Sequence, residues 1–314
     1  MRKILLTVLL SAFWLSSSQA IELRLMTGSE QGTYYQIGQE TSKATDRTGI
    51  HLQVLPSQGS WENIVALYNG DTEFAILQVD AFMQAAKNLY RNTAVKIDEE
   101  IRVVMPLYRE EIHVIKALGR ELDFVNQESF LVGCGKENSG SCLTAAVLED
   151  VYGKQFKYLW SDYETAFANL KRGALDLVII TAGKPYPLLV EQSGLEIVSL
   201  PRFEKVTEFY SRAKLGPQDY PWMEGEVDTY SVRSVLATMI QEEEGLANDL
   251  VGSVHFALRV NEAELKKSGH SKWDEVLFNG YINGLSHAGA LRSLNACNAI
   301  KGFGYQCTDM VSVK

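Results

Sequence analysis

Strand-like and helix-like segments alternate along most of this chain. Short apolar runs bounded by Gly or polar turns predict strands, and apolar residues at helical spacing predict the helices between them. In the first half the predicted strands are residues 23–26, 51–55 and 74–79, and the predicted helices are residues 33–46, 61–68 and a segment from the third strand through Tyr90. Ser60 is the predicted N-cap of the second helix. Such alternation predicts a mainly parallel sheet with right-handed crossovers.

The pattern restarts after two neighbouring apolar runs, residues 101–108 and 112–118, which suit a crossing between two lobes. The second half has predicted strands at residues 130–133, 158–160, 175–180, 195–200 and 229–236, and predicted helices at residues 142–152, 163–171 and 185–192. The rest reads as helical to about Asn295. We therefore expect an α/β fold of two lobes with a ligand cleft between them: residues 21–112 form lobe 1, residues 113–228 form lobe 2, and residues 229–314 return to lobe 1.

The first lobe opens with a Gly-rich turn at a helix start, Gly28 to Gly32, followed by Thr33 and Tyr34. Gly allows close approach to the backbone, and the free amides and dipole at a helix N-terminus favour an anion. The alternative is a plain tight connection between a strand and a helix. The position of the turn, at the carboxyl end of a strand, favours a ligand wall.

The second lobe repeats this arrangement in residues 133–141. The segment has the Gly-x4-Gly spacing of a phosphate-binding loop, but Ser141 stands where that loop needs lysine, so a nucleotide site is excluded. What remains is a helix start that can hold a small anion with amides and hydroxyls, with Ser139, Ser141 and Thr144 as the candidates. The alternative is ordinary N-capping by Ser139 or Ser141.

The first 20 residues have the features of a cleavable signal peptide. Arg2 and Lys3 precede a short, largely apolar run, and Ser18 and Ala20 give the small-x-small pattern before a cleavage site. The run is shorter than the roughly 20 residues that a spanning helix needs. We expect cleavage after Ala20 and a periplasmic protein that begins at Ile21.

The composition is that of an ordinary globular protein with an acidic balance. The formal net charge is −9, and no basic cluster is evident. Nucleic acid is therefore not an expected partner, because phosphates favour clustered Lys and Arg. A recessed site for a small anion stays compatible with this charge, since local dipoles govern it.

Four cysteines allow three disulfide connectivities. We prefer Cys134–Cys142 and Cys297–Cys307, since each pair closes a short loop. A metal site is not favoured, because no pair has the Cys-x-x-Cys spacing. No Gly-x-Ser-x-Gly or His-Glu-x-x-His motif is present, so we expect no enzyme, no metal and no cofactor.

Several short motifs, in this order and spacing, resemble the TAXI-type solute-binding proteins of tripartite (TRAP) transporters. They are residues 27–38 around Gly28 and Tyr34, 58–63, 78–80, 139–145, 182–185 and 287–290. The resemblance spans nearly the whole mature chain. It departs from the family in Ser141, where Thr is common, in the flanking cysteines, and in Ala288, where Pro is usual.

The resemblance implies a fold like that of type II periplasmic binding proteins. It implies a receptor that closes on a small organic anion or amino acid, dicarboxylate or glutamate-like, and delivers it to membrane permease subunits. We expect the receptor to be a monomer. A periplasmic sensor for a membrane signalling protein, or less readily a secreted enzyme, are the alternatives. The expected ligand-binding residues are Gly28, Ser29, Gly32, Thr33, Tyr34, Ser60, Gln78, Ser139, Gly140, Ser141, Thr144, Ala182, Gly183 and Pro185. Arg109 or Lys184 is expected to assist them.

Overall fold

The structure is a computed structural model that describes residues 21–84, 100–202, 210–242, 245–300 and 311–313. The predicted signal peptide, residues 1–20, lies outside these ranges, as does the predicted helix beyond residue 84. Within the described ranges, no helix combines the length and apolar character that crossing a membrane requires.

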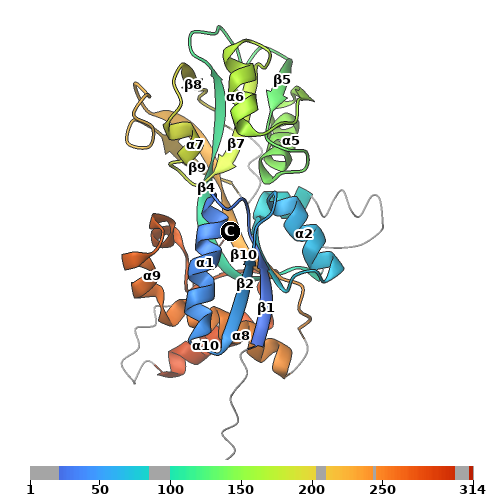
Figure 1. Ribbon diagram of the computed structural model, residues 1–314, viewed down its shortest axis with the longest axis vertical. Helices are drawn as coiled ribbons and strands as arrows, with labels where there is room; N and C mark the ends of the chain where they lie inside the picture. Colours follow the sequence, from blue (N-terminus) through green and yellow to red (C-terminus); the bar gives the residue numbers. More distant parts are fainter. Residues whose placement is uncertain (1–20, 85–99, 203–209, 243–244, 301–310, 314) are drawn as a thin grey trace, which may run out of the picture.

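One ten-stranded sheet passes through both lobes of the molecule (Figure 1). Its strand order is β2-β1-β3-β10-β4-β7-β5-β6, with β8 on β4 and β9 on β10. Two long antiparallel strands, β4 (Arg102–Ala117) and β10 (Val227–Thr238), connect the lobes. The N-terminal part of β4 lies in lobe 1, and its residues from Glu111 onward pair with β7 of lobe 2.

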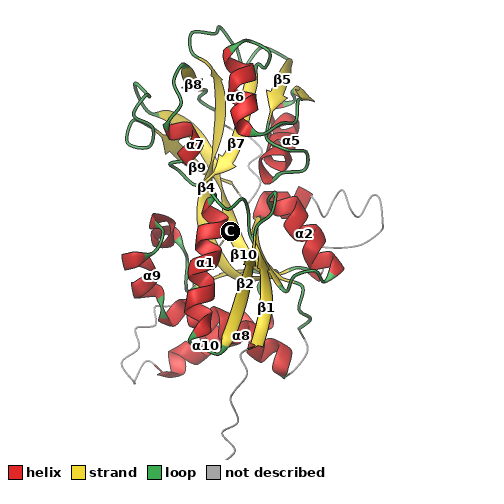
Figure 2. Ribbon diagram, in the orientation of Figure 1, coloured by secondary structure: helices red, strands yellow, loops and turns green. Residues whose placement is uncertain are grey.

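Lobe 1 places three parallel strands beside this pair, and helices cover both faces (Figure 2). The strands are β1 (Ile21–Met26), β2 (Ile50–Leu55) and β3 (Phe74–Gln78), and the helices are α1 (Thr33–Asp46), α2 (Ser60–Asn69), α8 (Leu246–Val260), α9 (Glu262–Ser268) and α10 (Ala288–Ile300). A 3-10 helix, η1 (Ser271–Glu275), and the short pair β11 (Gly280–Ile282) and β12 (Val311–Val313) complete it. Trp273, Phe278, Leu25 and Ile37 belong to a fully buried core that ties η1 to the sheet.

Lobe 2 repeats the plan on a smaller scale. Its strands are β5 (Ser129–Gly133), β6 (Gln155–Tyr158), β7 (Leu177–Ala182), β8 (Leu195–Ile197) and β9 (Tyr210–Leu215), and its helices are α5 (Gly140–Tyr152), α6 (Tyr163–Lys171) and α7 (Pro187–Val190). Phe167, Leu177, Ile179 and Leu189 are buried on the two faces of β7.

The two apolar runs 101–108 and 112–118 do form the crossing between the lobes, but as one strand instead of two, because β4 is continuous through the polar residues Arg109 to Glu111. These polar residues do not form a turn; they line the junction of the lobes. Strand β6 begins three residues before the predicted 158–160, and neither β9 nor β11 was predicted. The expected lobe boundaries near residues 112 and 228 fall within β4 and at the start of β10, and they stay a prediction.

Candidate functional site

A cavity of about 150 Å³ lies between the lobes, where the N-terminal ends of α1, α2 and α5 meet. Most of the expected ligand-binding residues line it: Gly28, Gly32, Thr33, Tyr34, Ser60, Gln78, Ser139, Gly140, Ser141, Ala182 and Gly183. The cavity is small compared with the roughly 300–1,000 Å³ of pockets for drug-sized ligands, so it suits a compact solute. A larger groove of about 470 Å³ beside β8 lies on the surface of lobe 2, away from these helix ends.

Three of the expected residues lie outside the lining. Ser29 is exposed, and its Oγ and carbonyl oxygen would lie 3.1 and 3.2 Å from a Cβ added at Gly32, so it shapes the turn rather than the cavity wall. Thr144 donates its hydroxyl hydrogen bond to Asp80. Pro185 follows a cis peptide bond and is exposed.

Two of the three helices present uncapped amides to the cavity. Gly32 and Gly59 are the N-caps of α1 and α2, and neither helix has a side-chain cap. The backbone N–H groups of Thr33 and Ser60 find no acceptor among the described contacts. Because an orphan N–H group at a helix start carries partial positive charge, each helix end favours a negatively charged group beside it.

The expected N-cap role of Ser60 was wrong. Gly59, with φ of 110°, takes the N-cap position, and α2 begins at Ser60 itself. The Ser60 hydroxyl instead accepts a hydrogen bond of 3.1 Å from the backbone N–H of Gln78. The side chain therefore fixes the end of β3 beside the cavity.

On the lobe 2 side, Ser139 is the N-cap of α5, and its hydroxyl accepts from the Cys142 amide at 3.3 Å. Ser141 accepts a hydrogen bond of 2.9 Å from the backbone N–H of Thr181 on β7. The hydroxyl of Thr181 is buried in the cavity wall and has no partner among the described residues. A buried hydroxyl without a partner is uncommon, so it is available to a bound molecule.

The lobes touch at Gly140. A Cβ placed on Gly140 would lie 1.7 Å from Oε1 of Gln78, and one placed on Gly59 would lie 3.6 Å from the Gly140 amide nitrogen. Lobe 2 therefore approaches lobe 1 almost backbone to backbone at this point.

Glu110, which the sequence analysis missed, provides the acidic wall of the cavity. It is 4% exposed, lies on β4 opposite Val232, and accepts a hydrogen bond of 2.9 Å from the Tyr34 hydroxyl. Burial raises the pKa of the Glu110 carboxyl to about 8. No Lys, Arg or His is among the lining residues, so the described part of the cavity wall offers this acid no cation.

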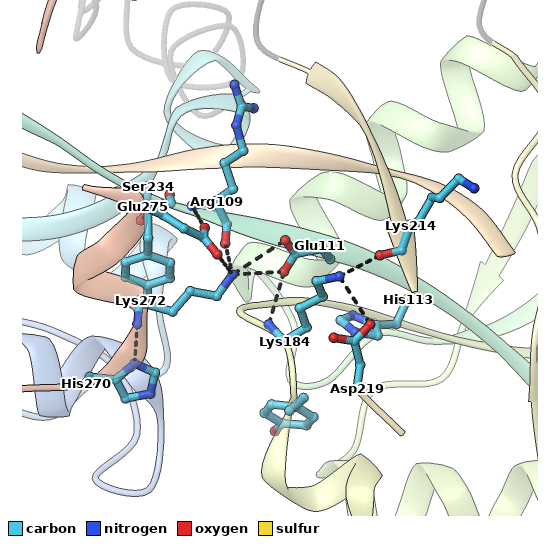
Figure 3. A network of polar contacts seen from close by, with 12 residues as sticks. Arg109, Glu111, His113, Lys184, Lys214, Asp219, Ser234, His270, Lys272 and Glu275 are labelled. Atoms are coloured by element: carbon cyan, nitrogen blue, oxygen red, sulfur yellow. Dashed lines mark hydrogen bonds and ion pairs between the residues drawn. The ribbon is translucent and has the colours of Figure 1, made fainter. Parts of the chain in front are cut away.

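The next residue along β4, Glu111, is bound by residues of both lobes (Figure 3). Lys272 of η1 donates from Nζ to Glu111 Oε2 at 3.3 Å and to Glu275 at 2.7 Å. The backbone N–H of Lys184, which follows β7, donates to the same Glu111 oxygen at 3.0 Å. Glu111 therefore joins η1 of lobe 1 to the end of β7 in lobe 2.

Neither basic residue expected to assist lines the cavity. The Nζ of Lys184 forms an ion pair of 3.1 Å with Asp219 and a hydrogen bond to the Lys214 carbonyl oxygen. Arg109 contributes backbone contacts, its N–H donating to Glu275 and its carbonyl oxygen accepting from Lys272. The ion pair with Asp219 directs the Lys184 ammonium away from the cavity, and Arg109 is outside the lining, so assistance from either residue stays a prediction.

A second buried polar cluster lies behind the cavity. Asp80, 3% exposed, accepts hydrogen bonds from Thr144 at 2.6 Å and from Tyr210 at 2.7 Å. Gln78 donates to Thr144 at 3.4 Å. Burial raises the pKa of Asp80, and the two hydroxyl donors act in the opposite direction.

The disulfide Cys134–Cys142 is confirmed, with Cα atoms 4.9 Å apart. It joins the turn after β5 to the first turn of α5, beside the residues that line the cavity. The other expected pair is not described, because Cys307 lies outside the described residues and nothing is described of the side chain of Cys297.

Further lining residues that were not among the expected ligand-binding residues are Gln58, Gly59, Tyr163, Thr181 and Tyr186. Gln58 and Gly59 belong to a motif that the resemblance did include, and Ser60 was taken as its functional member. Tyr163 and Tyr186 are single aromatic residues at helix starts, and only the fold brings them to the cavity.

A two-lobed α/β fold with a cavity between the lobes and helix N-termini directed into it is that of the substrate-binding proteins. The chain belongs to the NMT1-like family, whose sequence model matches residues 25–293.

Solved structures agree on the fold. The ligand-binding component of an ABC-type import system from Staphylococcus aureus, solved with zinc bound, is 12% identical with a TM-score of 0.50, over 88% of this chain and 84% of that chain. A protein from Bordetella bronchiseptica RB50 is 14% identical with a TM-score of 0.51, over 89% and 90%. A TctC solute binding protein from Polaromonas is 16% identical with a TM-score of 0.47, over 90% and 94%. The first two structures support the similarity. At these sequence identities the similarity concerns the fold alone.

Proposed function

We propose that the protein is an extracytoplasmic solute receptor of the TAXI type, which binds a small carboxylate-bearing solute between its lobes and delivers it to the permease subunits of a TRAP transporter. The observation that carries this proposal is the convergence of helix N-termini from both lobes on one small cavity. The motifs around Gly28, Gln58 and Ser139 that resemble TAXI proteins all contribute to that cavity.

The helix ends favour a carboxylate. The amides of Thr33 and Ser60 are free among the described contacts, and α5 offers those of Gly140 and Ser141 across the cleft. A carboxylate oxygen that accepts such donors forms charge-assisted hydrogen bonds without a buried Lys or Arg. Because the donors come from both lobes, a bound carboxylate would hold the lobes together.

This role is non-enzymatic and periplasmic, with a monomer as the acting unit. In the proposed cycle, the open form admits the solute and the closed form is presented to the membrane subunits. Closure by a hinge between lobes belongs to a common repertoire of domain motion. The long strands β4 and β10 are the connections about which the lobes would turn.

The test begins with a thermal-shift screen of small carboxylates and amino acids. A solute that binds only the folded protein adds about 2.7 kcal/mol at 100 times its Kd. For a chain of this size that raises Tm by about 5–10 °C. Small-angle scattering with the solute found should show a smaller radius of gyration than without it.

Thr33→Pro then tests the amide itself. Thr33 is the first residue of α1 and follows Gly32, whose φ of −91° and ψ of 160° suit a residue before proline. Proline is well tolerated at this first helical position, yet it removes the N–H group. Losing one charge-assisted hydrogen bond should weaken binding about 10- to 150-fold.

Thr33→Val is the matched control, because it removes the hydroxyl and keeps the amide. It should bind within a few-fold of the wild-type protein in calorimetric titration. Equal affinity of the wild-type protein and Thr33→Pro would contradict the proposal that the α1 amides hold the carboxylate.

A further inference from the structure

The cavity has an acidic side as well as a side of helix N-termini. Glu110 accepts from the Tyr34 hydroxyl through Oε2, and its other oxygen, Oε1, has no described partner. The side chain is 4% exposed and lines the cavity. A buried carboxyl group without a cation is costly, so its position in a cleft calls for a partner from the ligand.

The two neighbouring acids on β4 differ in this respect. Glu111 has Lys272 within 3.3 Å and the Lys184 amide at 3.0 Å. Glu110 has only a hydroxyl donor, although it is equally buried. Side chains of successive strand residues point to opposite faces of the sheet. Lys272 therefore pairs with Glu111, and the Glu110 side chain lies on the face of the cavity.

We propose that Glu110 is the residue that selects for a positively charged nitrogen in the solute, so that the preferred ligand carries an ammonium group as well as a carboxylate. The carboxylate lies at the helix N-termini and the ammonium at Glu110. This inference rests on the proposed function, since it takes the carboxylate site as given. It distinguishes amino acids from plain dicarboxylates, which the helix ends alone would accept equally.

The surroundings of Glu110 determine whether binding of an ammonium group releases or takes up a proton. Burial is the main cause of its raised pKa, the hydrogen bond from Tyr34 lowers that pKa, Asp80 and Glu111 raise it, and Lys272 lowers it. The carboxyl group is therefore largely protonated at neutral pH in the empty cavity. An ammonium group favours the carboxylate form, so binding should release a proton.

The experiment uses matched pairs of probes that differ only in the amino group: L-glutamate with glutarate, L-norvaline with pentanoate, and 4-aminobutanoate with butanoate. For any pair that binds the wild-type protein, the amino member should bind at least about 10-fold tighter, the scale of one hydrogen bond to a charged group. Calorimetry at pH 7 in buffers of different ionisation enthalpy should show proton release with the amino member only. Its affinity should rise with pH up to about 8.

Glu110→Gln should reduce the ratio within each pair to about one, because the amide keeps the size of the carboxyl group but cannot ionise. Glu111→Gln is the matched control, a neighbour that is equally buried but lies outside the cavity lining. It should lower the affinity for both members alike and leave their ratio unchanged.

The outcomes separate the two proposals. Equal or tighter binding of the acids without nitrogen, or proton uptake with the amino members, would overturn the role of Glu110 while leaving the carboxylate site intact. If no member of any pair binds, or if Thr33→Pro binds the probes like the wild-type protein, the carboxylate site itself fails and both proposals fall.

Discussion

Thr144 Oγ1 lies 2.6 Å from Asp80 Oδ2, and the two residues belong to different lobes. Thr144 is on α5 of lobe 2, whereas Asp80 follows β3 of lobe 1. Tyr210 donates to the same oxygen at 2.7 Å. Hydrogen bonds to a buried acid therefore join the two lobes behind the cavity without any solute.

Removing the Thr144 hydroxyl should weaken this contact between the lobes. Thr144→Val keeps the shape and loses one hydrogen bond at a buried acid, which is worth about 1–3 kcal/mol. We expect the free energy of unfolding to fall by that amount in urea titrations, and the affinity for the solute to fall with it. Thr144→Ser restores the donor and should recover most of both losses. If Thr144→Val has the same free energy of unfolding and the same affinity as the wild-type protein, the hydrogen bond from Tyr210 alone is enough to stabilise the buried Asp80.

Glu110 makes the stability of the empty receptor depend on pH. Its pKa rises from an ordinary value of 4.5 to about 8 in the folded protein. The free energy of unfolding is therefore highest below about pH 4.5, where Glu110 is protonated in both the folded and the unfolded chain, and it falls as the pH rises through 8. Glu110→Gln avoids this loss. The variant should equal the wild-type protein near pH 4.5 and exceed it by on the order of 5 kcal/mol above pH 8.

Urea titrations at several pH values would check this difference. Glu226→Gln is the control, since Glu226 is exposed and its hydrogen bond to Lys214 lowers its pKa. That variant should gain nothing over the wild-type protein as pH rises. A flat difference between Glu110→Gln and the wild-type protein across this range would contradict the buried, protonated state of Glu110.

Ser141→Ala should affect folding as well as binding. The Ser141 hydroxyl accepts from the backbone N–H of Thr181, and its loss leaves a buried donor unpaired. The expected cost is about 1–3 kcal/mol in the free energy of unfolding without any solute. Thr33→Val, which removes a cavity hydroxyl with no described internal partner, should leave that free energy unchanged in the same urea titration.

The disulfide at the start of α5 should stabilise lobe 2. It closes a short loop, with a sequence separation of 8, so the chain-entropy estimate is about 2–3 kcal/mol. Replacing Cys134 and Cys142 together by Ala should lower Tm by about 4–12 °C. Calorimetric scans of the oxidised wild-type protein and the variant would measure the shift. An unchanged Tm would show that the disulfide does not reduce the conformational entropy of the unfolded chain.

Local signals in the sequence predicted most of the elements and the bounds of two helices. The bounds Thr33–Asp46 and Tyr163–Lys171 agree with α1 and α6, since each helix has a clear start and a regular apolar period. Most residues expected at the cavity line it because the Gly-rich turns lie at strand ends, where an α/β fold places its ligands.

The acidic side of the cavity could not be predicted in this way. Glu110 and Glu111 interrupt an apolar pattern, and polar residues between two apolar runs normally indicate a turn. Their roles depend on Tyr34 and Lys272, which are 76 and 161 residues away in the sequence. Only the crossing of β4 between the lobes brings these residues together.

The contact at Gly140 limits what this position can hold. A single added methyl group would overlap Oε1 of Gln78, so either the Gln78 amide moves into the space for the solute or the lobes remain apart. Alanine suits the start of a helix, so the chain would still fold. One methyl group would thus give a folded receptor that either has less room for its solute or cannot bring its lobes together around it.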